Sequence, residues 1–200
     1  VSENLRLEQD MRQALTRGEF TVHYQPIVDL HAGEVTGGEA LIRWIHPQRG
    51  MVSPGRFIPL AEDTGLIIPI TDRILDQVIA QVAGWVRAGH DTLNISVNIS
   101  VRYCREPDFV ERILSRLHHA GLSPRHLTLE ITESLFLDGE VDKTAEALGQ
   151  LRRQGLKISM DDFGTGYSSL GFLKRIPLDV LKVDKSFVSG LSREPRDRTL

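Results

Sequence analysis

The chain has 200 residues, 40% of them hydrophobic, and its 24 basic and 27 acidic residues give a formal net charge of -3. This composition fits one folded domain and excludes a disordered or collagen-like chain. It also argues against a protein that wraps nucleic acid, because binding duplex phosphates requires a concentrated basic surface. Cys104 is the only cysteine, so no intrachain disulfide can form, which agrees with a reducing compartment.

No membrane segment is expected in this chain. Its most apolar stretch, residues 66–70, contains Pro69 and is followed directly by polar residues, far short of the roughly 20 apolar residues that a spanning helix needs. No signal peptide is visible, and the chain begins with Val1 rather than methionine. An excised piece of a longer protein is therefore an open alternative.

The first part of the chain, up to Ala88, predicts a helix, a two-stranded hairpin and two further helices. Apolar residues at steps of three and four indicate the helices, and alternating β-branched and aromatic residues indicate the strands. Asp29 and Gly33 are typical of the hairpin turn. The expected helices are Asn4–Arg17, Pro54–Thr64 and Thr71–Ala88, and the expected strands are Phe20–Val28 and Glu34–Trp44.

After Gly89 strands and helices alternate regularly, which is typical of parallel strands joined by crossover helices. The expected strands are Leu93–Ile99, Leu127–Ile131, Leu156–Met160 and Val180–Val183, and the expected helices are Pro107–Ala120, Glu140–Gln154 and a short one near Ser168–Lys174. No glycine-rich phosphate loop follows an early strand, which favours a β/α barrel over a doubly wound sheet.

The predicted fold class is thus α/β, a TIM-like barrel with an antiparallel first strand. Six strands are expected, whereas a closed eight-stranded barrel takes about 250 residues. We therefore expect residues 1–200 to form one domain that is incomplete at its C-terminus, with the final strand and helix units missing.

Polar residues gather where the predicted strands end, and in a β/α barrel the active site lies at that face. Only Glu39 lies inside its strand, in the hairpin. Any single residue of this kind could instead cap a helix or form a turn, but their coincidence on five strands favours a site. The residues are Glu39, Asn98, Glu130, Asp161, Asp162, Lys182 and Asp184.

Several carboxylates on one barrel axis repel each other, by roughly 4 kcal/mol per pair at 4 Å in an effective dielectric of about 20. Cations would relieve this repulsion, and ligands that are all oxygen suit Mg²⁺ or Mn²⁺ better than Zn²⁺. Asp161 and Asp162 would point to opposite faces of a regular strand, but Gly164 and Gly166 let the chain bend there. Two ions about 4 Å apart, as in enzymes of phosphoryl hydrolysis, are therefore plausible.

Six short motifs follow one another along the chain. They are His23-Tyr24-Gln25-Pro26, Glu39-Ala40-Leu41 with Arg43-Trp44, Val97-Asn98-Ile99-Ser100, Leu129-Glu130-Ile131-Thr132-Glu133-Ser134, residues 161–170 (Asp-Asp-Phe-Gly-Thr-Gly-Tyr-Ser-Ser-Leu), and Leu181-Lys182-Val183-Asp184 before Ser186-Phe187. In these motifs and in their order the chain, from about Asn4 to its end, resembles the EAL family of bacterial cyclic di-GMP phosphodiesterases.

The resemblance implies a role for each matching position. Glu39, Asn98, Glu130 and Asp161 would bind the first metal ion, with Asp161 shared and Asp162 binding the second. Lys182 would orient the attacking water, and Gln25 and Arg43 would contact the substrate. Glu133 would anchor the loop from Asp162 to Leu170. Asp184 is as readily a helix N-cap as a member of the site.

The reaction implied is hydrolysis of cyclic di-GMP to linear pGpG with two Mg²⁺ or Mn²⁺ ions. The family's closing Val-Ala-Glu-Gly-Val-Glu type motif and glutamine are not in this sequence, so an isolated 200-residue protein would hold one metal at best and turn over little substrate. The alternative is a cyclic di-GMP receptor without catalysis, although such receptors usually carry substitutions in the metal acids. A purely structural barrel is disfavoured because clustered acids are costly to bury.

The resemblance also implies a homodimer through the loop after Asp162 and a connection to sensor or cyclase domains. The expected location is the cytoplasm, either as a free protein or as the cytoplasmic part of a membrane-anchored protein. No nucleic-acid polymer is expected as a partner, and no membrane segment is expected in this chain.

Overall fold

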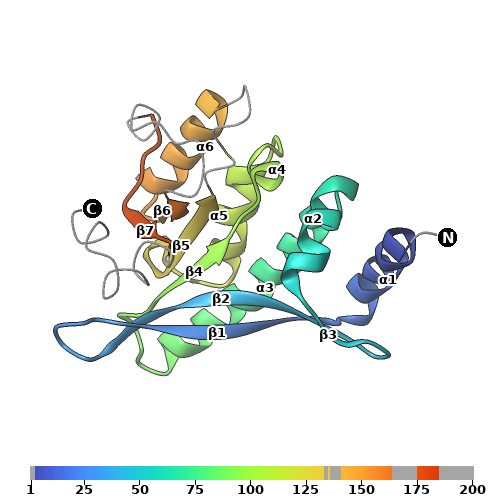
Figure 1. Cartoon of the computed structure of the whole chain (residues 1–200). Coiled ribbons are helices and arrows are strands. Elements are labelled where there is room, and N and C mark those ends of the chain that lie inside the picture. Colours follow the sequence, from blue (N-terminus) through green and yellow to red (C-terminus); the bar gives the residue numbers. More distant parts are fainter. Residues whose placement is uncertain (1–2, 133–134, 136–140, 164–174, 185–200) are drawn as a thin grey trace, which may run out of the picture.

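A computed structural model describes residues 3–132, 135, 141–163 and 175–184, with the backbone alone of Asp162. One sheet with the strand order β1-β2-β4-β5-β6-β7 forms its centre, and a short strand, β3, pairs with β2 (Figure 1). The strands are β1 (Phe20–Val28), β2 (Val35–His46), β3 (Gly50–Val52), β4 (Asn94–Asn98), β5 (Leu127–Thr132), β6 (Lys157–Phe163) and β7 (Val180–Val183).

The helices lie between these strands in the chain. They are α1 (Glu3–Arg17), α2 (Pro54–Thr64), α3 (Ile67–Arg87), α4 (Val101–Cys104), α5 (Phe109–His119), α6 (Val141–Arg153) and a 3-10 turn, η1 (Pro124–His126). None of the helices within the described ranges is long and apolar enough to cross a membrane.

The strand directions confirm the predicted barrel type. β1 runs antiparallel to β2, and from β2 through β4, β5, β6 and β7 each neighbouring pair is parallel. β1 and β7 lie at the two ends of the described sheet. Parallel pairing brings the carboxyl ends of β4 to β7 to one edge, which is the edge where the polar residues were predicted to gather.

The two faces of the sheet have different chemistry because side chains alternate along each strand. Val97, Leu129, Ile158 and Met160 are buried in the hydrophobic core, together with residues of the covering helices. The alternate positions of the same strands are buried but polar, as at Ser96, Thr128, Glu130 and Ser159. The apolar face therefore holds the fold together, and the polar face is available for a site.

Aromatic side chains fix the hairpin against the helices. Phe20 of β1 and Trp44 of β2 lie 5.5 Å apart, ring centroid to ring centroid, and both contact Phe57 of α2. Farther along β1, Tyr24 packs edge-on against Trp85 of α3 at 4.9 Å. These contacts hold β2, and with it Glu39, in a fixed position relative to α2 and α3.

Most predicted elements are confirmed within a few residues, and two differences have clear physical reasons. Helix α3 begins at Ile67 rather than Thr71, because Pro69 falls in its first turn, where a missing backbone N–H breaks no helical hydrogen bond. Strand β6 runs on to Phe163, past the predicted end at Met160. β3, α4 and η1 were not predicted, since three or four residues show no clear periodicity. The helix predicted near Ser168–Lys174 lies outside the described residues.

Candidate active site

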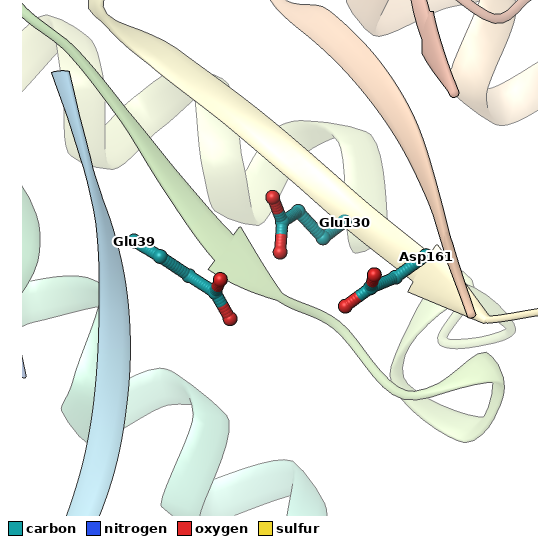
Figure 2. Close-up of side chains that lie close together, drawn as sticks. All are labelled: Glu39, Glu130 and Asp161. Atoms are coloured by element: carbon teal, nitrogen blue, oxygen red, sulfur yellow. The ribbon is translucent and has the colours of Figure 1, made fainter. Parts of the chain in front are cut away.

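Three carboxylates from three strands meet above the carboxyl edge of the sheet. One oxygen each of Glu39, Glu130 and Asp161, the acid cluster, all lie within 4.8 Å of one another. Figure 2 shows the side chains of β2, β5 and β6 directed into the same space. The structure therefore brings together three of the four carboxylates that the sequence placed in a metal site.

Glu39 reaches the cluster because β2 approaches β4 very closely. Gly37 of β2 pairs with Asn94, and a Cβ at Gly37 would lie only 2.1 Å from the Asn94 carbonyl oxygen. The parallel pairing continues to Glu39 opposite Ser96 and ends one residue later. Glu39 thus stands one residue before the parallel pairing of β2 with β4 ends, although the strand itself runs on to His46.

An irregularity in β6 lies at the two adjacent aspartates. Met160 pairs with Leu181 and Phe163 with Val183, so three steps along β6 match two along β7. The extra residue falls within Asp161–Asp162, and a bulge of this kind redirects side chains near active sites. The backbone therefore departs from regular alternation inside the strand, before the glycines that the sequence analysis held responsible.

Lys182 joins the acid cluster from β7. Its Nζ donates hydrogen bonds to Glu130 Oε2 at 2.8 Å, Glu39 Oε2 at 3.0 Å and Asp161 Oδ2 at 3.2 Å. Asn98 at the end of β4 donates from Nδ2 to Glu39 Oε1 at 2.9 Å. Five of the seven predicted residues are thus within one hydrogen-bonded group.

The charges of this group influence one another strongly. Burial raises the pKa of Glu130, whose residue is only 2% exposed, and the hydrogen bond and positive charge of Lys182 oppose that rise. Burial also favours the neutral form of Lys182, but hydrogen bonds to Glu130 and Glu39 outweigh it and raise the lysine pKa. The contacts between Lys182 and Glu130 thus favour the charged form of each partner, since they lower the pKa of the acid and raise that of the lysine.

The donor set fits a hard divalent cation. Glu39, Glu130 and Asp161 offer only oxygen, and the Asn98 side chain adds an amide oxygen next to them. Mg²⁺ and Mn²⁺ prefer carboxylate, carbonyl and water oxygens. Among the described residues, no histidine or cysteine belongs to this group of possible ligands, which disfavours zinc.

An apolar cavity of about 330 Å³ lies beside the acid cluster. Asn98 and Arg43 belong to its wall, and isoleucines of α2 and α3, including Ile58, Ile67 and Ile70, supply much of the remainder. Arg43 donates from Nη1 to the neighbouring Ile42 carbonyl at 2.8 Å. Such a cavity can hold a flat apolar group while a polar group of the same ligand reaches the acids.

Gln25 lies on β1 directly opposite Glu39 in the antiparallel register and is exposed.

Asp184, the residue after β7, is half-buried, and its role stays a prediction. Glu133 and the side chain of Asp162 lie outside the described part of the chain, so their predicted roles stay predictions too.

Sequence reasoning missed the contacts of the short helix α4, which begins three residues after Asn98. The Ser100 side chain caps α4 by accepting from Tyr103 N at 3.2 Å, and Tyr103 Oη donates to Asp72 Oδ1 of α3 at 2.6 Å. Arg102 Nη1 contacts the Glu62 carbonyl. The sequence Asn98-Ile99-Ser100 contained a signal for this arrangement, since serine is a preferred helix N-cap.

Comparison with known proteins shows the family of the chain. The family model described as "EAL domain" matches residues 8–200. The chain is 43% identical over 200 residues to the bifunctional diguanylate cyclase/cyclic di-GMP phosphodiesterase MucR of Pseudomonas aeruginosa, and 41% identical over 197 residues to the cyclic di-GMP phosphodiesterase NbdA of the same species. These alignments cover 100% and 98% of this chain but only 29% and 25% of the relatives.

A solved structure of the MucR phosphodiesterase in complex with cyclic di-GMP superposes on this chain with a TM-score of 0.89 at 43% identity. The match covers 97% of this chain and 78% of that one. A structure of the EAL enzyme Bd1971 with bound cAMP and cyclic di-GMP gives a TM-score of 0.90 at 36% identity, covering 98% of this chain and 54% of the other.

Proposed function

This chain belongs to the EAL domain family, and from that premise we propose that it hydrolyses one phosphodiester bond of cyclic di-GMP to give linear pGpG. The single observation that carries the proposal is the acid cluster. Three carboxylates from separate strands, one of them buried, contact one ammonium within the described part of the chain. An arrangement so rich in negative charge is costly to build unless it binds cations.

The residues around this place have distinct tasks in the proposed reaction. Glu39, Asn98, Glu130 and Asp161 would hold one Mg²⁺ or Mn²⁺ ion, and Asp162 would hold a second that shares Asp161. Bound divalent cations supply Lewis acidity, which lowers the pKa of a water and offsets negative charge at the phosphate. Lys182 holds three carboxylates in place and would orient the attacking water through the same ammonium.

The substrate would lie across the acid cluster and the neighbouring cavity. One scissile phosphate would sit above Glu39 and Asp161, within reach of Arg43, whose guanidinium suits a phosphate because of its fixed donor geometry. The apolar cavity would accept a flat base. Gln25, exposed on β1 directly opposite Glu39 and therefore on the same face of the sheet, would contact the substrate next to it.

Further properties belong to the same proposal. We expect Glu133 and the loop after Asp162 to link the metal site to a homodimer interface, with Asp184 supporting that loop. The long relatives, one named as bifunctional, suggest that a domain of this type works next to sensor or cyclase domains. A cytoplasmic location would give it access to its substrate.

The test is conversion of cyclic di-GMP to pGpG by the full-length protein in Mg²⁺ or Mn²⁺, with chelator as the blank. Glu39→Ala should abolish turnover, whereas Glu34→Ala, which removes an exposed carboxylate just before the same strand, should leave it unchanged. Binding of cyclic di-GMP without turnover in any divalent metal would contradict the proposal and identify a receptor.

A further inference from the structure

The hydrogen bonds of Lys182 suggest a second task for this residue, separate from its place in the reaction. Its ammonium donates to all three members of the acid cluster at 2.8 to 3.2 Å. An ammonium has three N–H donors. Within the described residues Lys182 therefore directs its full donor capacity at the oxygens of the proposed metal ligands.

A divalent cation bound at the acid cluster would compete with Lys182 for the same carboxylate oxygens. Metal ions of this class bind oxygens at roughly 2.0 to 2.6 Å, and the ammonium nitrogen already lies about one hydrogen-bond length from one oxygen of each carboxylate. Two positive charges held so close in a poorly solvated place repel each other. Glu39 and Asp161 are partly exposed, whereas Glu130 is not, so their carboxylates have the freedom to reorient toward a cation from solvent.

We propose that Lys182 is the resident counter-cation of the acid cluster, and that a divalent metal binds by taking over at least part of its carboxylate contacts. Lys182 then stabilises the fold without metal and weakens metal binding. The same ammonium, displaced from Glu39 and Asp161, is left beside the metal and free to contact a water. This inference rests on the proposed metal site, but it does not depend on hydrolysis.

Removing the positive charge of Lys182 distinguishes a counter-cation of the acid cluster from a residue that only orients the attacking water. In the full-length protein, Lys182→Met should lower the thermal midpoint in chelator, because the hydrogen bonds and the positive charge that Lys182 supplies to all three carboxylates are lost. The same variant should bind Mn²⁺ about tenfold or more tightly by calorimetry, because the competing cation is gone. Mn²⁺ should accordingly raise its midpoint more than that of the wild type.

Lys157→Met is the matched control, because it removes an equal charge from an exposed position at the start of β6. It should leave both the midpoint and the Mn²⁺ affinity unchanged. Lys182→Arg keeps the charge and serves if the methionine variant does not fold. We expect it to bind Mn²⁺ no more tightly than the wild type.

The proposal requires both results for Lys182→Met. Equal or weaker Mn²⁺ binding overturns it, as does an unchanged midpoint in chelator, and tighter Mn²⁺ binding by Lys182→Arg overturns it as well. Absence of Mn²⁺ binding by the wild type would instead overturn the proposed function, so the two failures are distinguishable.

Discussion

Two groups of charged side chains in this molecule look alike in the sequence, but their charges are compensated in different ways. On the outer surface, Asp72 of α3 accepts hydrogen bonds from Tyr103 Oη at 2.6 Å, Arg112 Nη1 at 2.8 Å and Arg116 Nη2 at 2.8 Å. At the strand ends the numbers are reversed, because three carboxylates share the one ammonium of Lys182.

This difference separates an ionic network that stabilises the fold from one that serves a reaction. In the outer network the two guanidinium groups also contact Asp76, Asp108 and Glu106, whose side chains are 28% to 57% exposed, so water screens the acids that exceed the cations there. The acid cluster instead includes Glu130, whose side chain is 2% exposed, and within the described part of the chain Lys182 is the cation that contacts all three carboxylates. Negative charge that is so poorly screened favours an external cation.

The largest expected effect is the loss of turnover in Glu130→Gln. This isosteric change removes one carboxylate of the acid cluster, so hydrolysis of cyclic di-GMP should fall by more than about a hundredfold. The thermal midpoint in chelator should not fall, because a buried charge has been removed. Glu111→Gln on the exposed side of α5 is the control and should match the wild type. A stable protein with near-normal turnover would place the metal elsewhere.

Asp72→Ala should lower stability and leave metal binding nearly unchanged, the reverse of Glu130→Gln. Two guanidinium groups and the Tyr103 hydroxyl would lose their shared acceptor, which costs about 2 kcal/mol of unfolding free energy. Denaturant unfolding measures this loss, and calorimetry should show little change in Mn²⁺ affinity. If Mn²⁺ binding fell as much as stability, the two groups would not be independent and the contrast between them would fail.

Asn98→Ala sharpens the boundary of the site. It removes the amide that contacts Glu39 Oε1, so the Mn²⁺ affinity should drop by about tenfold with a small change in stability. Asn94→Ala is an informative comparison, since Asn94 lies at the other end of β4, where its side chain contacts Arg125 and Thr128. Equal Mn²⁺ affinities of the wild type and Asn98→Ala would exclude Asn98 from the site.

The smallest effect concerns pH in the absence of metal. Burial raises the pKa of Glu130 in the folded state. Glu130 therefore stabilises the fold at pH values below the ordinary carboxyl pKa, and this stabilisation is lost as the pH rises through the raised pKa. The midpoint of the wild type relative to Glu130→Gln, measured in chelator, should therefore fall across this window. If the midpoint of the wild type relative to Glu130→Gln rose with pH instead, the pKa of Glu130 in the folded state would not be raised.

Much of this architecture could be predicted from the sequence because local signals and topology agree. Regular alternation after Gly89 predicted the parallel strands, and parallel strands necessarily bring Asn98, Glu130, Asp161 and Lys182 to one edge. Glu39 was the exception, because a strand that continues past its parallel partner gives no sign in its sequence of where parallel pairing ends.

The remainder depended on contacts between distant residues. Nothing local to Lys182 indicates that its ammonium contacts three carboxylates, and nothing local to Asp72 indicates a tyrosine and two arginines from α4 and α5. The bulge at Asp161–Asp162 is likewise a property of pairing with β7 rather than of its own residues. Such features arise only when the elements are assembled.

The central claim is that Glu39, Glu130 and Asp161 together bind a divalent metal. Anomalous diffraction from crystals grown with Mn²⁺, recorded on both sides of the manganese absorption edge, tests it most directly. The account predicts an anomalous peak at coordination distance, roughly 2.0 to 2.6 Å, from oxygens of all three carboxylates. Manganese bound only at exposed acids, with Lys182 still donating to all three carboxylates, would contradict it.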